Sequence, residues 1–396
     1  MRRALLLFAL TLAVSANVRG ADLLAFWDVP RHGANCFNEV PPDAEYFRAL
    51  RAYGASWVRL TFSKWKSARG GDFLFGDLDD YHGLVPEDLA VLRAVLDRAA
   101  AAGLKVVLTT LELPGSRWRQ QNDGQFDDRL WSDKRYWLQS AAFWRDLAAG
   151  LADHPAIAAY NLLNEPVPEL RGGLDEHAAP ETMALWYRTA RGTARDLPGL
   201  YAALIASVRA SDARTPIMLD AGFYAAADAW SYWPAALSDA RLLYAWHMYE
   251  PWSATSASNL KREHPWRYPG EAPFGTGQAR WDASTVAAYL QQPIDWARRH
   301  GVALNRLVAA EFGCMRRWPD CPQYLEDVLG ALDAQHVHWA FYSFREAWDG
   351  MDYELGSDKL PWQYWEAQEQ GRPYELKRGP NKVFEPILRR LRADGR

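Results

Sequence analysis

The chain has 396 residues, and 49% of them are apolar, which is ample for a sizeable buried core. This length allows two average domains, although α/β barrels of similar length often form a single domain. The formal net charge is −4, so the composition predicts no basic surface for nucleic acid or anionic lipid.

The N-terminus has the pattern of an export signal. Arg2 and Arg3 precede an apolar run at 4–14 that is too short to span a bilayer comfortably, and Ala16 fits a cleavage point. A single membrane anchor is the alternative interpretation. We expect residues 1–16 to be a signal peptide and residues 17–396 to form one domain. The mature protein is then expected to be secreted or periplasmic, with no membrane segment.

Strand-like and helical patterns alternate along the rest of the chain. Apolar, β-rich runs predict strands at 33–37, 56–62, 104–111, 157–164, 216–221, 241–248, 306–312 and 336–344. Helical patterns lie at 43–52, 86–102, 132–152, 180–210, 225–237, 282–300, 323–335 and 382–391. Eight alternations predict an α/β fold, a single TIM (β/α)8 barrel with parallel strands.

Three long connections follow the third, sixth and eighth predicted strands, at 112–131, 250–281 and 345–381. In a barrel they lie at the C-terminal ends of the strands, where active sites form. They contain Trp118, Trp131, Trp252, Trp266, Trp348, Trp362 and Trp365. These rings argue against disorder. We expect most aromatic residues of the chain in the core and some stacked on the apolar faces of sugar rings.

The three cysteines predict at most one disulfide. Cys314 and Cys321 lie seven positions apart, a separation that suits a bridge closing a short loop. Cys36 is left over, and its pairing with either partner stays open at this point. The chain has no Cys-x-x-Cys motif and no glycine-rich phosphate or dinucleotide loop, so we expect neither a metal nor a cofactor.

Two glutamates end predicted strands. Glu165 lies in Asn-Glu-Pro at the end of the fourth strand, and Glu311 lies in Glu-Phe-Gly at the end of the seventh. Both side chains are expected in one cleft, and two carboxylates facing one bond are what glycoside hydrolysis requires. Glu165 is the predicted general acid/base, with a pKa raised by burial, and Glu311 the predicted nucleophile. The alternatives are a helix N-cap for Glu165 and a structural ion pair for Glu311.

Four further polar residues are expected to support these carboxylates. Arg59 lies in an otherwise apolar strand, where an unpaired charge is costly, so we expect it to meet a carboxylate such as Glu311. His247 and Tyr249 alternate at the end of the sixth strand and therefore point the same way. Tyr249 is expected to donate to Glu311, and Asn164 to donate to a sugar hydroxyl.

Taken in order, these motifs resemble glycoside hydrolase family 5, the cellulase-like retaining glycosidases built on a TIM barrel. The resemblance is carried by Arg59, Asn164-Glu165-Pro166, His247-x-Tyr249 and Glu311-Phe312-Gly313, and it extends from about residue 33 to residue 344. It implies a double displacement in which Glu165 protonates the leaving oxygen and Glu311 forms the glycosyl-enzyme. Such a mechanism places the two carboxyl groups roughly 5–5.5 Å apart.

The chain departs from the family pattern at two positions. Leu111 stands where the family usually has a histidine near the end of the third strand, and Glu112 is a neighbour that can fill some of that space. Phe344 is expected in the place of the usual tryptophan beneath the sugar, unless Trp348 folds back into it. These departures leave the chemistry of the two glutamates unchanged and bear on the identity of the substrate.

The expected function is an exported retaining β-glycoside hydrolase acting on a β-linked polysaccharide or oligosaccharide, as an endo-β-1,4-glucanase. A β-mannanase or an exo-β-glucosidase on the same scaffold is the alternative among enzymes, and transglycosylation uses the same intermediate. A non-catalytic carbohydrate-binding barrel is the alternative from another class, motivated by the missing histidine. The sequence predicts no oligomeric state.

Overall fold

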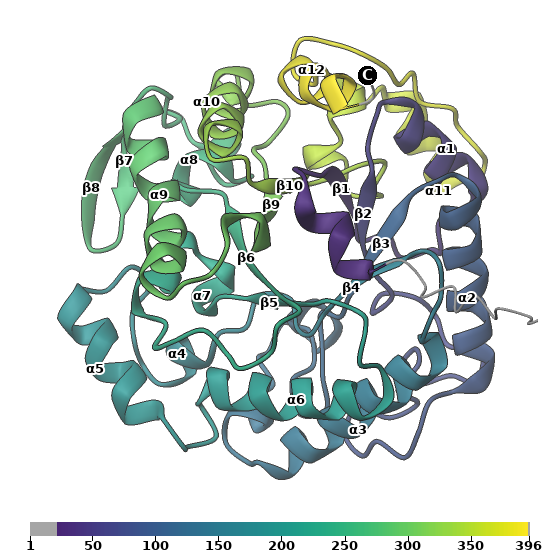
Figure 1. The fold of residues 1–396 in the computed structure, drawn as a ribbon. Helices are drawn as coiled ribbons and strands as arrows, with labels where there is room; N and C mark the ends of the chain where they lie inside the picture. Colours follow the sequence, from purple (N-terminus) through teal and green to yellow (C-terminus); the bar gives the residue numbers. More distant parts are fainter. Residues whose placement is uncertain (1–21, 395–396) are drawn as a thin grey trace, which may run out of the picture.

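The protein forms a closed barrel of eight parallel strands surrounded by helices, in a computed structural model that describes residues 22–394 (Figure 1). The barrel strands are β1 (His32–Cys36), β2 (Trp57–Thr61), β3 (Lys105–Thr109), β4 (Ile157–Asn161), β5 (Ile217–Asp220), β6 (Leu242–Met248), β9 (Leu307–Phe312) and β10 (His338–Phe341). They pair in the order β1-β10-β9-β6-β5-β4-β3-β2. The predicted single (β/α)8 barrel is confirmed. The predicted signal peptide, 1–16, lies outside the described residues.

Helices cover the outside of the barrel and also occur in the connections after the strands. The larger ones are α1 (Ala44–Ala52), α2 (Pro86–Ala101), α3 (Arg135–Leu151), α5 (Pro180–Ala190), α6 (Leu197–Ser211), α9 (Ala283–Arg299), α10 (Cys321–Ala334) and α12 (Glu385–Asp394). The shorter ones are α4 (Pro168–Arg171), α7 (Gly222–Ala225), α8 (Trp252–Thr255) and α11 (Trp362–Glu369). No helix within 22–394 is both long and apolar enough to cross a membrane.

Two predicted helices differ from the structure. The run at 180–210 is broken between α5 and α6, because Gly192 takes a positive φ of 76° and Asp196 begins a new helix by capping the N–H of Gly199. The run at 225–237 forms only the short 3-10 helix η4 (Ala227–Tyr232), since a proline follows two residues later.

The connection after β6 contains an antiparallel hairpin that the sequence pattern did not predict. Its strands are β7 (Gly270–Phe274) and β8 (Gly277–Trp281). Pro273 interrupts β7 and a glycine begins each strand, so the period-two pattern of a hairpin is weak there. The hairpin lies beside α8 and α9 at the edge of the barrel (Figure 1).

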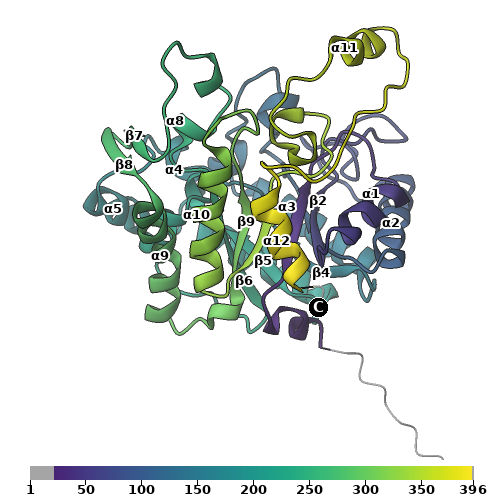
Figure 2. The ribbon, with the colours of Figure 1, turned by 90° about the horizontal axis from the view of Figure 1, so that it is seen from above.

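The barrel interior is filled at its N-terminal end. Side chains alternate along β2, so that Trp57 and Arg59 point inward while the residues between them pack outward. The 3-10 segment η1 (Leu23–Asp28) lies across this end, and its buried Trp27 donates to the Ala158 carbonyl at 3.2 Å. Figures 1 and 2 show η1, in dark purple, closing the base. The opposite, C-terminal ends of the strands are therefore where a ligand can enter.

Candidate active site

A cavity of about 520 Å³ lies at the C-terminal ends of the barrel strands. Side chains from all eight strands, or from the loops that follow them, line it. One lining residue from each is Phe37, Lys64, Leu111, Glu165, Tyr224, Tyr249, Glu311 and Tyr342. The wall combines aromatic rings with a few carboxylates, which is the usual character of a small-ligand site.

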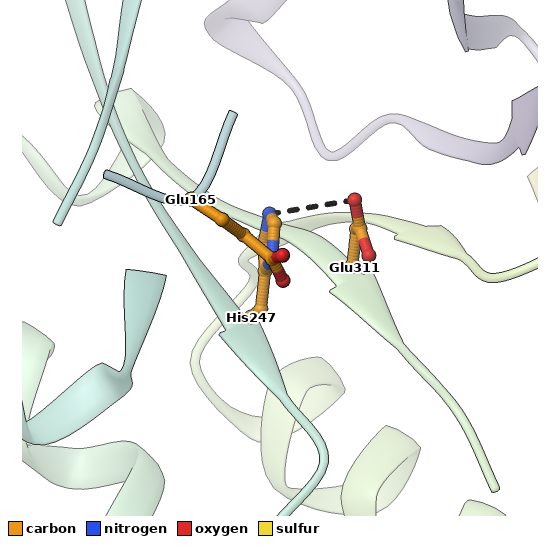
Figure 3. Close-up of side chains that lie close together, drawn as sticks. All are labelled: Glu165, His247 and Glu311. Atoms are coloured by element: carbon orange, nitrogen blue, oxygen red, sulfur yellow. Dashed lines mark hydrogen bonds and ion pairs between the residues drawn. The ribbon is translucent and has the colours of Figure 1, made fainter. Parts of the chain in front are cut away.

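Glu165 and Glu311 face the same cavity, and His247 lies beside them (Figure 3). One carboxylate oxygen from each glutamate and one imidazole nitrogen all lie within 4.8 Å of one another. The Glu165 side chain is 18% exposed, whereas Glu311, within β9, is almost fully buried. Such a separation is close to the roughly 5–5.5 Å of retaining glycosidases and well below the roughly 6.5–9.5 Å of inverting ones.

Arg59 is buried beneath the two glutamates, and its guanidinium donates to several oxygens. It contacts Glu311 Oε1 at 2.5 Å, Asn164 Oδ1 at 2.8 Å, Asn161 Oδ1 at 2.7 Å and Asp220 Oδ2 at 3.2 Å. The predicted contact between Arg59 and Glu311 is confirmed. Glu311 therefore forms the ion pair that the structural interpretation required, and its carboxylate still lines the cavity.

His247 and Tyr249 hold the two carboxylates from β6 and its end. The Tyr249 hydroxyl donates to Glu311 Oε2 at 2.7 Å, as strand alternation predicted. His247 Nδ1 lies 2.8 Å from Glu165 Oε1, and its Nε2 lies 3.7 Å from Glu311 Oε1. Burial lowers the pKa of His247, so the imidazole is neutral near pH 7. Each glutamate thus has its own hydrogen-bond partner.

The two glutamates differ in how firmly they hold a proton. Burial, with a contribution from nearby Asp220, raises the pKa of Glu165 to about 8. Burial also raises the pKa of Glu311, but the Arg59 guanidinium and the Tyr249 hydroxyl oppose that rise. Because Arg59 contacts Glu311 directly, Glu311 is the carboxyl group that ionises first. When the pair holds a single proton, Glu165 is the carboxyl group that carries it.

The family model described as "Cellulase (glycosyl hydrolase family 5)" matches residues 19–347. The chain belongs to glycosyl hydrolase family 5. It is therefore a retaining glycoside hydrolase, as the motifs indicated, and the alternative of a non-catalytic sugar-binding barrel is not supported. No curated protein matches this family 5 hydrolase in sequence.

Solved endoglucanase structures share the fold of this family 5 hydrolase. Pseudomonas stutzeri endoglucanase Cel5A in complex with cellobiose is 20% identical, with a TM-score of 0.61, over 91% of this chain and 92% of the other. A mutant form of Thermotoga maritima Cel5A with cellobiose is 16% identical, with a TM-score of 0.62, over 93% and 100%. Thermotoga maritima Cel5A with mannotriose is 15% identical, with a TM-score of 0.58, over 82% and 92%.

The prediction for Phe344 is wrong. The resemblance placed Phe344 at the end of the last strand, but β10 ends at Phe341, three residues earlier. The Phe344 ring is buried against Tyr46 and Tyr53 instead. Tyr342 lines the cavity of the family 5 hydrolase, and Trp348 folds back to line it as well.

Leu111 lines the cavity, so an apolar side chain occupies a wall where the family usually has a histidine. Glu112 does not compensate for the missing imidazole. Its buried carboxylate accepts the backbone N–H of Trp118 at 3.2 Å, and burial raises its pKa to about 7. The wall next to Glu165 therefore offers fewer hydrogen-bond donors to a sugar than the family pattern implies.

Two polar residues beneath the site were missed by the sequence reasoning. Asn161 ends β4 and Asp220 ends β5, and both accept hydrogen bonds from Arg59. Asp220 Oδ2 also accepts the backbone N–H of Glu165, at 3.2 Å, where Glu165 has a positive φ of 49°. The same pattern that identified the glutamates, a polar residue at the end of an apolar strand, also marks these two positions.

A second polar cluster is formed by Glu176, His177, Asp228 and Glu250, and it reaches the cavity wall through Glu176 and Glu250. His177 Nδ1 is 2.7 Å from Asp228 Oδ2, and its Nε2 is 3.3 Å from Glu250 Oε1. Although burial favours the neutral ring, these two carboxylates raise the pKa of His177 to about 10. Burial and the nearby Glu250 raise the pKa of Glu176 to about 7. Glu176 and His177 lie in the loop between α4 and α5, away from the end of any strand, so no strand-end pattern marks them in the sequence.

Two carboxylate–histidine groups have ligand atoms within 4.8 Å of one another, a spacing that can hold a metal ion. They are Glu165 with His247 and Glu311, and Glu176 with His177 and Glu250. In both groups the imidazole is already hydrogen-bonded to a carboxylate. These contacts engage both ring nitrogens of His177 but only Nδ1 of His247, whose buried Nε2 has no hydrogen-bond partner within the described residues. The glycosidase chemistry of the family uses the carboxylates themselves.

The cysteines follow one of the arrangements left open by the sequence. Cys314 and Cys321 form a disulfide, which joins the segment after β9 to the start of α10. Cys36 is a free, buried thiol. The bridge lies three residues beyond Glu311, so it restrains the chain next to the predicted nucleophile.

Proposed function

We propose that this family 5 hydrolase is an exported endo-β-1,4-glucanase that cleaves its substrate by double displacement. The observation that carries the proposal is the pair Glu165 and Glu311, whose carboxylate oxygens lie within 4.8 Å of each other in one cavity. Endoglucanases solved with cellobiose share the fold, which supports a β-linked glucan as the substrate.

In this mechanism Glu311 attacks the anomeric carbon and forms the glycosyl-enzyme, while Glu165 gives its proton to the leaving oxygen. Neutral His247 can donate from Nδ1 to Glu165 Oε1, which leaves Oε2 free to carry that proton. Arg59 and Tyr249 hold Glu311 in position for attack. In the second step Glu165 takes a proton from water, and the hydroxide oxygen releases the sugar from Glu311.

The side chains around the pair suit a sugar ring. Asn164 Oδ1 is occupied by Arg59, so its amide NH₂ is left to donate to a sugar hydroxyl. Tyr342 and Trp348 line the cavity, with ring centroids 6.4 Å apart, and offer apolar faces for stacking. We assign both aromatic residues to substrate binding, in place of Phe344.

Endo action is supported by the shape of the site. A further cavity of about 230 Å³ shares Trp118, Asn164, Glu165 and Tyr224 with the main one. The space for substrate therefore continues past Glu165 toward the β3 and β4 loops, while Trp348 lies on the β10 side. A polymer can then extend beyond the cleaved bond in both directions, which exo action does not need.

A β-mannanase is the second candidate. A similar fold has been solved with mannotriose, and Leu111 changes the polar contacts available to the sugar in this chain. Export is supported by the N-terminal pattern at 1–16 and by the Cys314–Cys321 disulfide, because such bonds persist mainly in oxidising compartments. The N-terminal sequence of protein recovered from periplasm and medium tests both export and cleavage after Ala16.

The test is a screen of β-glucans, β-mannans and aryl β-glycosides, with NMR of the first product to read its anomeric configuration. Glu165→Gln is expected to lower kcat/KM by about 10²–10⁴, and Glu311→Gln to abolish turnover. Glu112→Gln is the matched control, because that carboxyl group is buried nearby but lies outside the cavity. Near-normal activity in either catalytic variant, or an inverted product, contradicts the proposal.

A further inference from the structure

One part of the chain leaves the barrel and is not needed for its core. Residues 357–377 run outward from the connection after β10 and carry the short helix α11. Among these residues, all of which the structure describes, Ala367 is the one that is buried. Figure 2 shows α11 standing clear of the barrel at the end opposite η1, which is the end that holds the catalytic cavity. This excursion, 357–377, also lies beyond the family match, which ends at residue 347.

The base of the excursion is firmly attached. The buried Arg316 donates to the Gly356 and Asp358 carbonyls at 2.7 Å and 2.6 Å. At the other end, Asn381 donates to the Gly379 carbonyl at 3.0 Å, and Arg378 pairs with Asp352. Both ends are thus tied to buried groups of the barrel, so the excursion leaves the molecule in a defined direction.

The tip of the excursion carries aromatic rings that do not pack into the core of the barrel. Trp362 and Trp365 are 65% and 52% exposed, and their spacing of three places both on one side of α11. Tyr364 packs edge-on against Trp365, with centroids 5.0 Å apart, and Tyr374 lies 6.0 Å from Tyr364. Exposed rings that do not serve the core are typical of a binding surface, and flat rings suit the apolar faces of sugars.

This surface adjoins the catalytic cavity. A second cavity of about 520 Å³ lies between the excursion and the loop after β1, and Tyr364, Tyr374 and Glu346 line it. Glu346 also pairs with Lys64 of the catalytic cavity at 3.4 Å. The segment 345–349 therefore has the catalytic cavity on one side, where Trp348 lies, and the second cavity on the other.

We propose that the excursion, 357–377, is a second glycan-binding platform that holds a distant stretch of the polysaccharide being cleaved. This inference rests on the proposed endo-glycanase function. A polymer that passes Trp348 on leaving the catalytic cavity reaches the polar second cavity and then the rings of Trp362 and Trp365. The platform adds affinity for long chains and contributes nothing to a substrate that fills only the catalytic cavity.

Two other occupants fit the observations less well. The excursion, 357–377, has three basic residues (Lys359, Arg372, Lys377) and four acidic ones (Asp358, Glu366, Glu369, Glu375), so its formal net charge is −1. An anionic lipid surface would favour an excess of basic residues. A second copy of the chain would find an eight-residue helix, which is small against the about 800 Å² per partner that a stable interface buries.

The experiment compares polymer binding with turnover of a short substrate. Binding to cellulose, barley β-glucan and glucomannan is measured in the inactive Glu311→Gln background, with and without Trp362→Ala and Trp365→Ala together. We expect the double variant to bind the polymer about tenfold more weakly. In the active background, kcat/KM on an aryl β-cellobioside is expected to stay within about twofold, because that substrate ends inside the catalytic cavity.

Two controls separate stacking from a general surface effect. Leu138→Ala removes an apolar side chain that is 74% exposed on α3, away from the excursion, and is expected to leave polymer binding unchanged. Trp362→Tyr and Trp365→Tyr together keep flat rings at both positions, and this variant is expected to retain most of the affinity for the polymer.

Each alternative result overturns the inference in a recognisable way. Unchanged polymer affinity in the double alanine variant contradicts the platform. The platform is also wrong if the double variant keeps its polymer binding but loses binding to phosphatidylglycerol vesicles, or loses dimerisation. If the parent protein hydrolyses the aryl glycoside but binds no polymer, the platform is wrong and the proposed catalytic function stands. If it hydrolyses no β-glycoside, the proposed function fails and the platform with it.

Discussion

Removing one hydroxyl, in Tyr249→Phe, tests how the site favours the ionised form of Glu311, the proposed nucleophile. The hydroxyl donates to Glu311 Oε2 at 2.7 Å inside a buried site. A hydrogen bond to a charged group is worth about 1.5–3 kcal/mol, and each pKa unit corresponds to about 1.4 kcal/mol. The bond favours the ionised carboxylate, so its loss raises the pKa of Glu311 by about 1–2 units. Activity requires the ionised form of Glu311. As the pH falls, the variant is therefore expected to lose activity at a higher pH than the parent protein does.

The assay is kcat/KM against pH on an activated aryl β-glycoside, whose good leaving group makes proton donation by Glu165 less important. We expect the acid limb of the profile to move up by about 1–2 pH units. Tyr353→Phe is the matched control, since that buried hydroxyl contacts the backbone of Cys314 and no carboxylate. An acid limb that moves equally in both variants, or in neither, refutes the reasoning.

Three further predictions follow from the same contacts. On substrates with a poor leaving group, kcat/KM should fall as pH rises through about 8, because Glu165 loses the proton that it must donate. Replacing Cys314 and Cys321 by serine should lower the free energy of unfolding by about 2–3 kcal/mol in urea titrations, since the bridge closes a short loop. Asp220→Asn should cost about 1.5–3 kcal/mol of stability, and should lower kcat/KM on every substrate, because Arg59 and the Glu165 backbone both lose an ionised acceptor.

Each of these has a contrasting measurement. The fall of kcat/KM at alkaline pH should be smaller when the leaving group is a nitrophenol, which needs less protonation. An equal fall on both substrates would assign it to a group other than Glu165. A reducing agent should destabilise the parent protein as much as the serine pair does, and no effect would mean that the bridge is absent. Glu45→Gln breaks an exposed ion pair with Arg48 and should change stability by less than about 1 kcal/mol; an equal loss would show that burial is not the cause.

The barrel was predictable because its strands are apolar runs separated by amphipathic helices, and all eight positions agree with the structure. Departures occurred where local chemistry overrides the pattern. Gly192 and Asp196 break one predicted helix into two, which a hydrophobicity pattern alone does not separate. The excursion that carries α11 was expected only as a connection, because it buries too little to show a periodic face.

The site was predictable where a polar residue lies within or shortly after the end of an apolar strand, as for Glu311 in β9, Tyr249 directly after β6, and Glu165 four residues after β4. Phe344 failed because its placement depended on where β10 stops, and strand ends are the least certain feature of a sequence pattern. His177 and Glu176 come from a loop whose path is set by tertiary contacts, among them the stacking of His177 on Phe274 of the hairpin at 4.2 Å. The contact joins residues almost a hundred positions apart, and no motif or periodicity in the sequence indicates it.

One buried oxygen, Oδ2 of Asp220, is connected by hydrogen bonds to both sides of the site. Asp220 Oδ2 accepts a hydrogen bond from Arg59, which also contacts Glu311, and another from the backbone N–H of Glu165, each at 3.2 Å. Glu165 and Glu311 are therefore both connected to the same residue at the end of β5, Glu165 directly and Glu311 through Arg59. A design that shifts one glutamate to turn retention into inversion therefore has to account for the contacts through which Asp220 also restrains the other.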